Sequence, residues 1–160
     1  MELRPYQPQD LDAILELFYE TVHAVNRRDY SPSQLDAWAP KQPDRDRWAQ
    51  SLAAHYTVVA VAGGTVAGFA DLASDGYFDR LFVHKDFQRQ GIATALAGWI
   101  EGKARELSLP SVCTEASITA RPFFEKRGYR VVQEQRKPHN GQVFVNFVME
   151  KRLGEPPHLH

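Results

Sequence analysis

The sequence lacks disulfide pairs, membrane-length apolar runs and an excess of one charge. It holds a single cysteine, Cys113, so no disulfide can form within the chain, and a reducing compartment is expected. No apolar run approaches the roughly 20 residues of a membrane-spanning helix, and the first residues lack the apolar core of a signal peptide. We therefore expect a cytoplasmic protein with no membrane partner.

The charge balance and the length limit the kinds of protein that this sequence can encode. A net charge of −1 argues against a general nucleic-acid binder, because such proteins usually carry a basic excess. Hydrophobic residues make up 43% of 160 residues, which is enough for a buried core and suits one domain. No repeat or low-complexity linker interrupts the sequence. We expect a single domain over residues 1–152 and a flexible tail over residues 153–160.

Three helices are predicted in the N-terminal third. Apolar residues at helical spacing predict the first, which begins near Asp10 and reaches Val25. Ser31, followed three residues later by Gln34, predicts the capped start of a short second helix. A third helix is expected over residues 44–54.

The remainder mixes strands and helices. A long helix is expected to open at Gly91, and a short one is expected over residues 119–126. Asn140-Gly141 is typical of a tight hairpin. The order predicts an α+β fold with helices on both faces of a central mixed, mostly antiparallel sheet of about six to seven strands. The expected strands that follow the N-terminal helices span residues 56–61, 66–72, 77–83, 112–116, 130–135 and 143–150.

The segment from Val83 to Gly91 carries the chemical signal. A strand ends, a polar loop follows, and a helix starts at a glycine. Amides at a helix start have no partner within the helix, and the helix dipole adds positive charge, so such a turn suits a diphosphate. The sequence has neither a P-loop nor a dinucleotide-binding pattern. The alternative is a helix that tolerates a glycine at its start, and these residues alone leave both possibilities open.

The loop resembles the acetyl-CoA-binding motif of the GNAT superfamily of N-acetyltransferases, Gln/Arg-x-x-Gly-x-Gly/Ala, spelled here over residues 88–93. Residues 116–129 resemble the family's downstream motif. The resemblance implies an enzyme that uses acetyl-CoA as co-substrate and transfers its acetyl group to a primary amine by direct attack. The alternatives are a non-catalytic acyl-CoA-binding sensor or interaction module on the same fold, and a plain structural domain.

The resemblance also implies the residues that bind the cofactor. A strand edge would pair with the pantetheine arm, helix-start amides would hold the diphosphate, and two strands would splay apart, often at a bulge, around the thioester. The implied residues are Leu81, Phe82, Val83, Gln88, Arg89, Gln90, Gly91, Ile92, Ala93, Thr94, Ser117, Ala120 and Phe124.

Two positions depart from the family pattern. Ser117 stands where the family commonly has asparagine, and its hydroxyl offers fewer donors. Phe124 stands where the family often has a tyrosine that protonates the leaving thiolate, and phenylalanine has no proton to give. Either another residue serves, or the thiolate leaves unaided, which a thiol pKa of roughly 8.5 allows.

An amine is mostly protonated at neutral pH, so a proton acceptor is expected. Asp79 shares the strand parity of the residues expected at the cofactor, Glu115 shares that of Ser117, and Asp71 lies on the adjacent strand. For each carboxylate the alternative is a solvated residue of the sheet. Tyr129 is a candidate acid, although an aromatic residue after a glycine also suits a core.

The acceptor site is expected from the N-terminal helices. Cys113 could carry the acyl group, but no Cys–His pair is evident, so a buried structural cysteine is favoured. No metal is expected, and related folds often pair, which allows a homodimer. The charges do not distinguish a small-molecule amine from a protein amine. The candidate substrate-binding residues are His23, Asn26, Tyr30 and Trp38, the last with a core position as its alternative.

Overall fold

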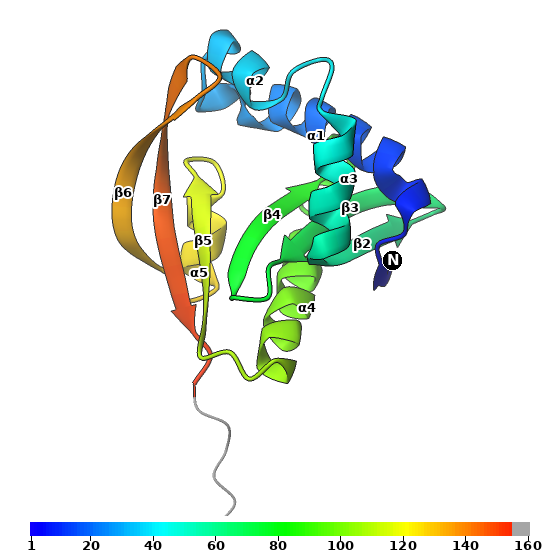
Figure 1. The fold of residues 1–160 in the computed structure, drawn as a ribbon, viewed down its shortest axis with the longest axis vertical. Coiled ribbons are helices and arrows are strands. Elements are labelled where there is room, and N and C mark those ends of the chain that lie inside the picture. The colour runs from blue at the N-terminus through cyan, green and yellow to red at the C-terminus, as the bar shows by residue number, and fades with distance from the viewer. Residues whose placement is uncertain (155–160) are drawn as a thin grey trace, which may run out of the picture.

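The computed structural model describes residues 1–154, so residues 155–160 of the predicted tail lie outside the described part. One seven-stranded sheet runs in the order β1-β2-β3-β4-β5-β7-β6 (Figure 1). All neighbours are antiparallel except β4 and β5, which run parallel. The strands are β1 (Glu2–Pro5), β2 (Tyr56–Ala62), β3 (Thr65–Leu72), β4 (Tyr77–Val83), β5 (Ser111–Ser117), β6 (Arg130–His139) and β7 (Gln142–Arg152).

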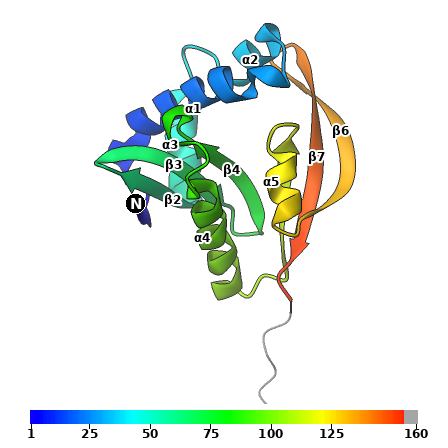
Figure 2. The ribbon, with the colours of Figure 1, turned by 180° about the vertical axis from the view of Figure 1, so that it is seen from behind.

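Helices cover both faces of the sheet, and each face has its own hydrophobic core (Figures 1 and 2). Ile14, Leu52 and Phe69 lie in the core on the side of α1–α3, whereas Phe78 and Leu96 lie in the core beneath α4. The predicted fold class is confirmed. The helices are α1 (Leu11–Val25), α2 (Pro32–Trp38), α3 (Arg45–Ala54), α4 (Ile92–Glu106) and α5 (Arg121–Lys126), with short 3-10 turns at η1 (Pro8–Asp10), η2 (Asn26–Arg28) and η3 (Lys85–Phe87).

The helix starts follow the predicted signals closely. Ser31 Oγ accepts from the Gln34 amide at 3.2 Å, and Gln34 Oε1 accepts from the Ser31 amide at 2.9 Å, so the predicted capping pair is present. The last hairpin is longer than predicted. Because β6 is an edge strand exposed along almost its whole length, it accommodates the polar run up to His139, including Pro138.

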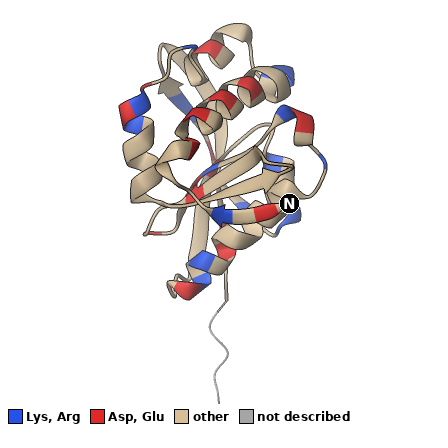
Figure 3. Cartoon of the chain, turned by 90° about the vertical axis from the view of Figure 1, so that its right-hand side faces the viewer, with Lys and Arg blue, Asp and Glu red and all other residues tan. Residues whose placement is uncertain are grey.

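The surface carries both signs of charge. In Figure 3, basic and acidic residues are interspersed over the face shown, in keeping with the net charge of −1. No helix within residues 1–154 combines the length and the apolar composition needed to cross a membrane.

The parallel pairing in the middle of the sheet is short. β4 and β5 are in register only at Tyr77 with Cys113 and Phe78 with Thr114, and beyond these positions the two strands diverge (Figure 1). On its other side, β4 changes register with β3, so that Asp79 is the extra residue of a β-bulge. The splay and the bulge that the family resemblance implied are therefore both present.

A buried carboxylate fastens α4 to the C-terminal strands. Glu101 is 2% exposed and accepts hydrogen bonds from Arg127 at 2.7 and 3.1 Å, from Tyr129 at 2.9 Å and from Lys151 at 3.0 Å. Burial alone would raise the pKa of Glu101, but these three donors outweigh it and hold the pKa below its ordinary value.

Replacement of Glu101 by glutamine should therefore destabilise the fold. The change removes the charge that neutralises Arg127 and Lys151, and we expect the free energy of unfolding at pH 7 to fall by about 1–3 kcal/mol in urea denaturation. Since the folded pKa lies below the unfolded value of about 4.3, the contribution is present above that value and lost as pH falls through the folded pKa. The gap between wild type and variant should shrink accordingly in acid.

Glu106→Gln is the matched control. This residue pairs with Lys103 at 2.9 Å on the exposed side of the same helix, so its loss should cost less than about 1 kcal/mol. Equal losses in the two variants would show that the buried network adds nothing beyond a surface pair.

Candidate active site

The turn between β4 and α4 presents free backbone amides. Gly91 caps the helix with φ of 81°, and Arg89 also adopts a positive φ of 61°, a conformation that suits glycine best. Apart from its two chain neighbours, no described residue has an atom within 4 Å of where a Cβ added at Gly91 would lie. The space beside Gly91 at the helix start is therefore open, as an anion site requires.

A hollow of about 250 Å³ opens at this turn. All of its lining residues except Phe87 and Phe123 were predicted at the cofactor. The other predicted cofactor residues do not line it; these are Leu81, Phe82, Gln90, Ser117, Ala120 and Phe124. The Gln88 side chain donates to the Val83 carbonyl at 2.7 Å and so helps to shape the turn itself. The lining residues are Val83, Phe87, Gln88, Arg89, Gly91, Ile92, Ala93, Thr94 and Phe123.

The free edge of β4 leads toward this hollow. The His84 amide bonds the Ala67 carbonyl on β3, and main-chain groups alternate between the two edges of a strand. The main-chain N–H and C=O groups of Val83 and Leu81 therefore point to the opening between β4 and β5. In agreement, the Val83 carbonyl accepts from Thr21 Oγ1 at 3.1 Å instead of bonding β3. An extended amide chain can hydrogen-bond to such an edge as an added strand.

Phe82 is placed differently from its two neighbours. Its main chain pairs with Phe69 on β3, and its ring packs 5.0 Å from that of Phe18 and 5.7 Å from that of Phe69. Phe124 is likewise a core residue, 3% exposed, with its ring 5.6 Å from that of Phe78. Both aromatic rings pack into the hydrophobic cores, and neither lines the hollow.

The end of β5 brings together polar groups that the sequence did not reveal. Ser117 Oγ accepts from the Ala120 amide at 3.0 Å, so this hydroxyl holds the turn before α5. Ser117 is the cross-strand partner of Asn146, which in turn pairs with Gln135 on β6. Among the described residues, the buried Asn146 Oδ1 and Gln135 Nε2 have no hydrogen-bond partner. Such buried amide atoms call for a water or a ligand.

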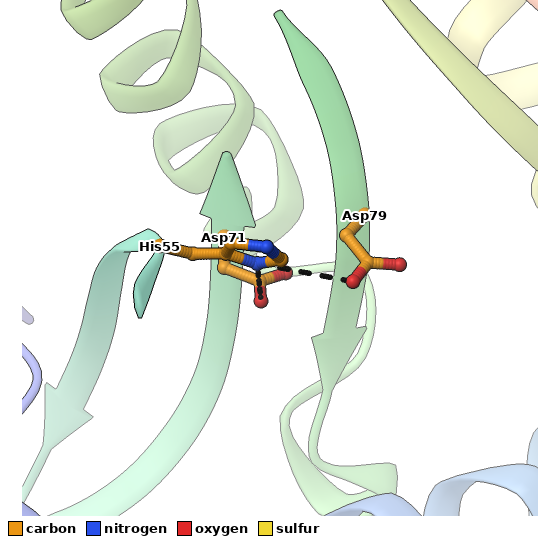
Figure 4. Close-up of side chains that lie close together, drawn as sticks. All are labelled: His55, Asp71 and Asp79. Carbon is orange, nitrogen blue, oxygen red and sulfur yellow. Dashed lines mark hydrogen bonds and ion pairs between the residues drawn. The ribbon is translucent and has the colours of Figure 1, made fainter. Parts of the chain in front are cut away.

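Asp79 belongs to a charged cluster at the bulge (Figure 4). Asp71 is fully buried, and its Oδ2 accepts from His55 Nδ1 at 2.9 Å and from Arg80 at 2.5 Å. Asp79 Oδ2 lies 3.8 Å from His55 Nδ1 and 3.5 Å from the Arg80 guanidinium. The parity prediction for Asp79 is wrong, because the bulge turns it, like Arg80, toward Asp71 and away from the face of Leu81.

The cluster shifts the proton affinities of its members. Burial raises the pKa of Asp79, and the negative charges of Asp71 and Glu115 add to this, whereas Arg80 and His55 oppose it. The hydrogen bond to Asp71 raises the pKa of His55. A carboxylate with a raised pKa at the point where two strands separate is suited to accept a proton.

Among the described residues, His55, Asp71 and Asp79 are the side chains grouped closely enough to hold a metal ion, with one ligand atom from each within 4.8 Å of the others. Arg80 already supplies positive charge to both carboxylates. Its guanidinium also lies 4.5 Å from the centre of the Trp48 ring and donates to Ser51 Oγ at 3.0 Å. The cluster is thus compensated by a fixed cation of the chain.

The two other catalytic candidates have partners of their own. Both carboxylate oxygens of Glu115 accept from Lys137 Nζ, at 2.7 and 2.9 Å. The Tyr129 hydroxyl donates to Glu101, and burial raises the pKa of this phenol. Tyr129 therefore lies in the network that fastens α4 to the sheet.

The candidate acceptor residues fall into two groups. The Tyr30 hydroxyl donates to the Val145 carbonyl at 3.2 Å and accepts from the Ile118 amide at 2.9 Å, which links β7 to the end of β5. Trp38 packs against it with ring centres 5.4 Å apart. His23 instead hydrogen-bonds the Ala39 carbonyl at 2.9 Å, and Asn26 is buried in the η2 turn.

Comparison with known proteins identifies the family. A sequence model described as an acetyltransferase (GNAT) domain matches residues 26–151. The chain belongs to the GNAT acetyltransferase family. The resemblance noted in the sequence is thereby confirmed, and with it the expectation of an acetyltransferase.

Individual relatives agree with this assignment. The chain is 36% identical over 149 residues to the uncharacterized N-acetyltransferase YafP of Escherichia coli (strain K12), covering 93% of this chain and 94% of that protein. A crystal structure described as a GCN5-related N-acetyltransferase, aminotransferase class-II, from Rhodopseudomonas palustris is 32% identical, with a TM-score of 0.92 and 94% of each chain covered. The PaiA N-acetyltransferase of Thermoplasma acidophilum in complex with coenzyme A has the same fold at 18% identity, with a TM-score of 0.77 and coverage of 94% and 98%.

The structure also predicts an unreactive Cys113. Burial raises the pKa of its thiol, and the charges of Glu150 and Glu115 raise it further. At pH 8 we expect iodoacetamide to alkylate the folded chain at least about tenfold more slowly than the urea-unfolded chain, because the thiolate is the reactive form. A rate in the folded chain equal to or above the unfolded one would instead indicate an activated nucleophile.

Proposed function

We propose that this protein transfers the acetyl group of acetyl-CoA to a primary amine by direct attack of the amine on the thioester. The observation that carries the proposal is the continuity of two main-chain features. These are the edge of β4 at Leu81 and Val83, which pairs with no strand on the side of β5, and the exposed amides that follow Gly91. Together they suit a ligand with an amide-bearing arm and a diphosphate. Family membership and the coenzyme A bound to the related PaiA structure support acetyl-CoA as that ligand.

In this proposal the helix-start amides of Ile92, Ala93 and Thr94 hold the diphosphate, and the exposed Arg89 adds positive charge. The pantetheine arm lies along the β4 edge, and the backbone amides that face the opening stabilise the oxyanion formed on attack. With Phe124 in the core, no side chain is assigned to protonate the leaving thiolate, which departs as the anion.

Asp79 is the carboxylate we assign as proton acceptor for the attacking amine. It stands at the bulge where β4 leaves β5 and has a raised pKa, whereas Glu115 is neutralised by Lys137. Tyr129 is given no role in proton transfer, because its hydroxyl is committed to Glu101. The ammonium proton passes to the Asp79 carboxylate, and the neutral amine then attacks the thioester carbonyl. Collapse of the tetrahedral adduct breaks the C–S bond and releases the coenzyme A thiolate, and the second proton of the nitrogen passes to water, which leaves the amide.

The acceptor is proposed to bind between the aromatic pair of Tyr30 and Trp38 and the strands below it. The unpaired amide atoms of Asn146 and Gln135 lie on these strands and provide one acceptor and one donor for a polar substrate. His23 and Asn26 support this wall through contacts with α2 and η2. An acceptor with both an amine and a further polar group fits these features.

A non-catalytic acyl-CoA sensor on the same fold is the second candidate, and the buried Phe124 favours it. Turnover separates the two. The proposal requires release of free coenzyme A above background from acetyl-CoA with at least one member of a panel of small amines and peptide amines. Tight acetyl-CoA binding without turnover across the panel would favour the sensor.

Replacement of Gly91 by glutamate should weaken acetyl-CoA binding by about tenfold or more in calorimetry, because it places a negative charge against the diphosphate. Gly91→Ala keeps the backbone strain without the charge, and it should bind more tightly than the glutamate variant. Gly98→Glu puts the same charge on an exposed part of α4, and its affinity should match wild type. Unchanged affinity in the Gly91→Glu variant would remove the diphosphate from this turn.

Asp79→Asn keeps the shape of the side chain but removes the proton acceptor. We expect kcat to fall by about 10²- to 10⁴-fold, with acetyl-CoA affinity unchanged, in a continuous thiol-release assay. The parallel variant Glu115→Gln should lose far less, since its carboxylate is paired with Lys137. The reverse ranking of the two variants would make Glu115 the base.

A further inference from the structure

His55 and Asp71 form a pair that neither the family motif nor the sequence pattern indicated. Asp71 is fully buried on β3, and such a carboxylate remains charged only when cations compensate it. It has two, His55 at the end of α3 and Arg80 on β4, both donating to the same oxygen. Because Asp71 accepts from His55 Nδ1, that nitrogen carries a proton, and a second proton is gained or lost at Nε2.

Asp79 faces this pair from the bulge. The charged or titratable groups around it are His55 at the α3–β2 junction, Asp71 on β3, Arg80 on β4 and Glu115 on β5, together with the Tyr77 phenol nearby. Two carboxylates, Asp71 and Asp79, thus share two cations. If His55 loses its charge, Arg80 alone compensates both carboxylates, and Asp79 then holds its proton more strongly.

We propose that His55 is a positioning residue that, through Asp71 and Arg80, fixes the Asp79 carboxylate at the bulge and keeps it ionised for proton transfer from the amine. The inference rests on the proposed function, in which Asp79 is the proton acceptor. His55 itself touches neither the amine nor the thioester. It acts by its charge and by the hydrogen bond that orients it.

Two substitutions separate charge from geometry. His55→Asn retains an N–H donor for Asp71 near the position of Nδ1 but carries no titratable charge, whereas His55→Ala loses both. His139→Asn is the matched control, because this histidine is exposed on the β6–β7 hairpin, away from the cluster. Thermal denaturation verifies that each variant is folded under the assay conditions.

The first readout is the dependence of kcat/KM on pH. A base that must be ionised gives a limb that falls in acid, and removing a nearby cation moves this limb to higher pH. We expect a shift of about half a pH unit or more in both His55 variants, with none in His139→Asn. A wild-type profile in His55→Asn, with or without a change in His55→Ala, would reduce His55 to a structural contact and overturn the proposal.

The second readout does not depend on turnover. Carbon NMR of the aspartate carboxyl groups, with the Asp79 signal assigned by Asp79→Asn, follows the titration of this group in each protein. The Asp79 midpoint should move to higher pH in both His55 variants. If it stays in place, the inference fails even where the enzyme is active. If it moves but no amine is acetylated, the coupling stands and the proposed function fails.

Discussion

The early separation of β4 from β5 is the constraint on which the rest of the structure depends. Main-chain N–H and C=O groups inside a protein need partners, yet beyond Phe78 β4 has no neighbouring strand on the side of β5. The surrounding elements keep that edge open. The bulge at Asp79 turns the strand, α4 packs beneath it, and the Glu101 network holds α4 against the C-terminal strands. The most distinctive feature of the molecule is therefore a missing pairing that the fold maintains.

The local parts of this arrangement could be predicted from the sequence. The Gly91 turn, the Ser31 cap and the order of helices and strands along the chain depend on short-range chemistry, which neighbouring residues specify, and all three are present in the structure. The family motif pointed to the same turn, because its residues are adjacent in the chain. Secondary-structure periodicity was sufficient to place helices on both faces.

What the sequence could not provide depends on register between strands. The predicted orientation of Asp79 relied on the alternation of side chains along a strand, and the extra residue at the bulge breaks that alternation. Asn146 and Gln135 lie beside Ser117 only because three strands align there. His55 meets Asp71 where β2 pairs with β3, and no pattern in the sequence pointed to this contact. Tyr129 suggested an acid by its type, whereas its partner Glu101 lies 28 positions away along the chain.

The Tyr30 phenol has a mechanical consequence. The part of the sheet formed by β1 to β4 is joined to the part formed by β5 to β7 by only two pairs of residues, at the base of the splay. At the far end, the Tyr30 hydroxyl links the N-terminal helices to the main chain of β7 and of the turn after β5, because it donates to Val145 and accepts from Ile118. Gln34, Asp29 and Ala37 make further hydrogen bonds to Val143, Thr119 and Asn140 beside this link. Together these contacts hold the two parts of the sheet apart at a fixed angle.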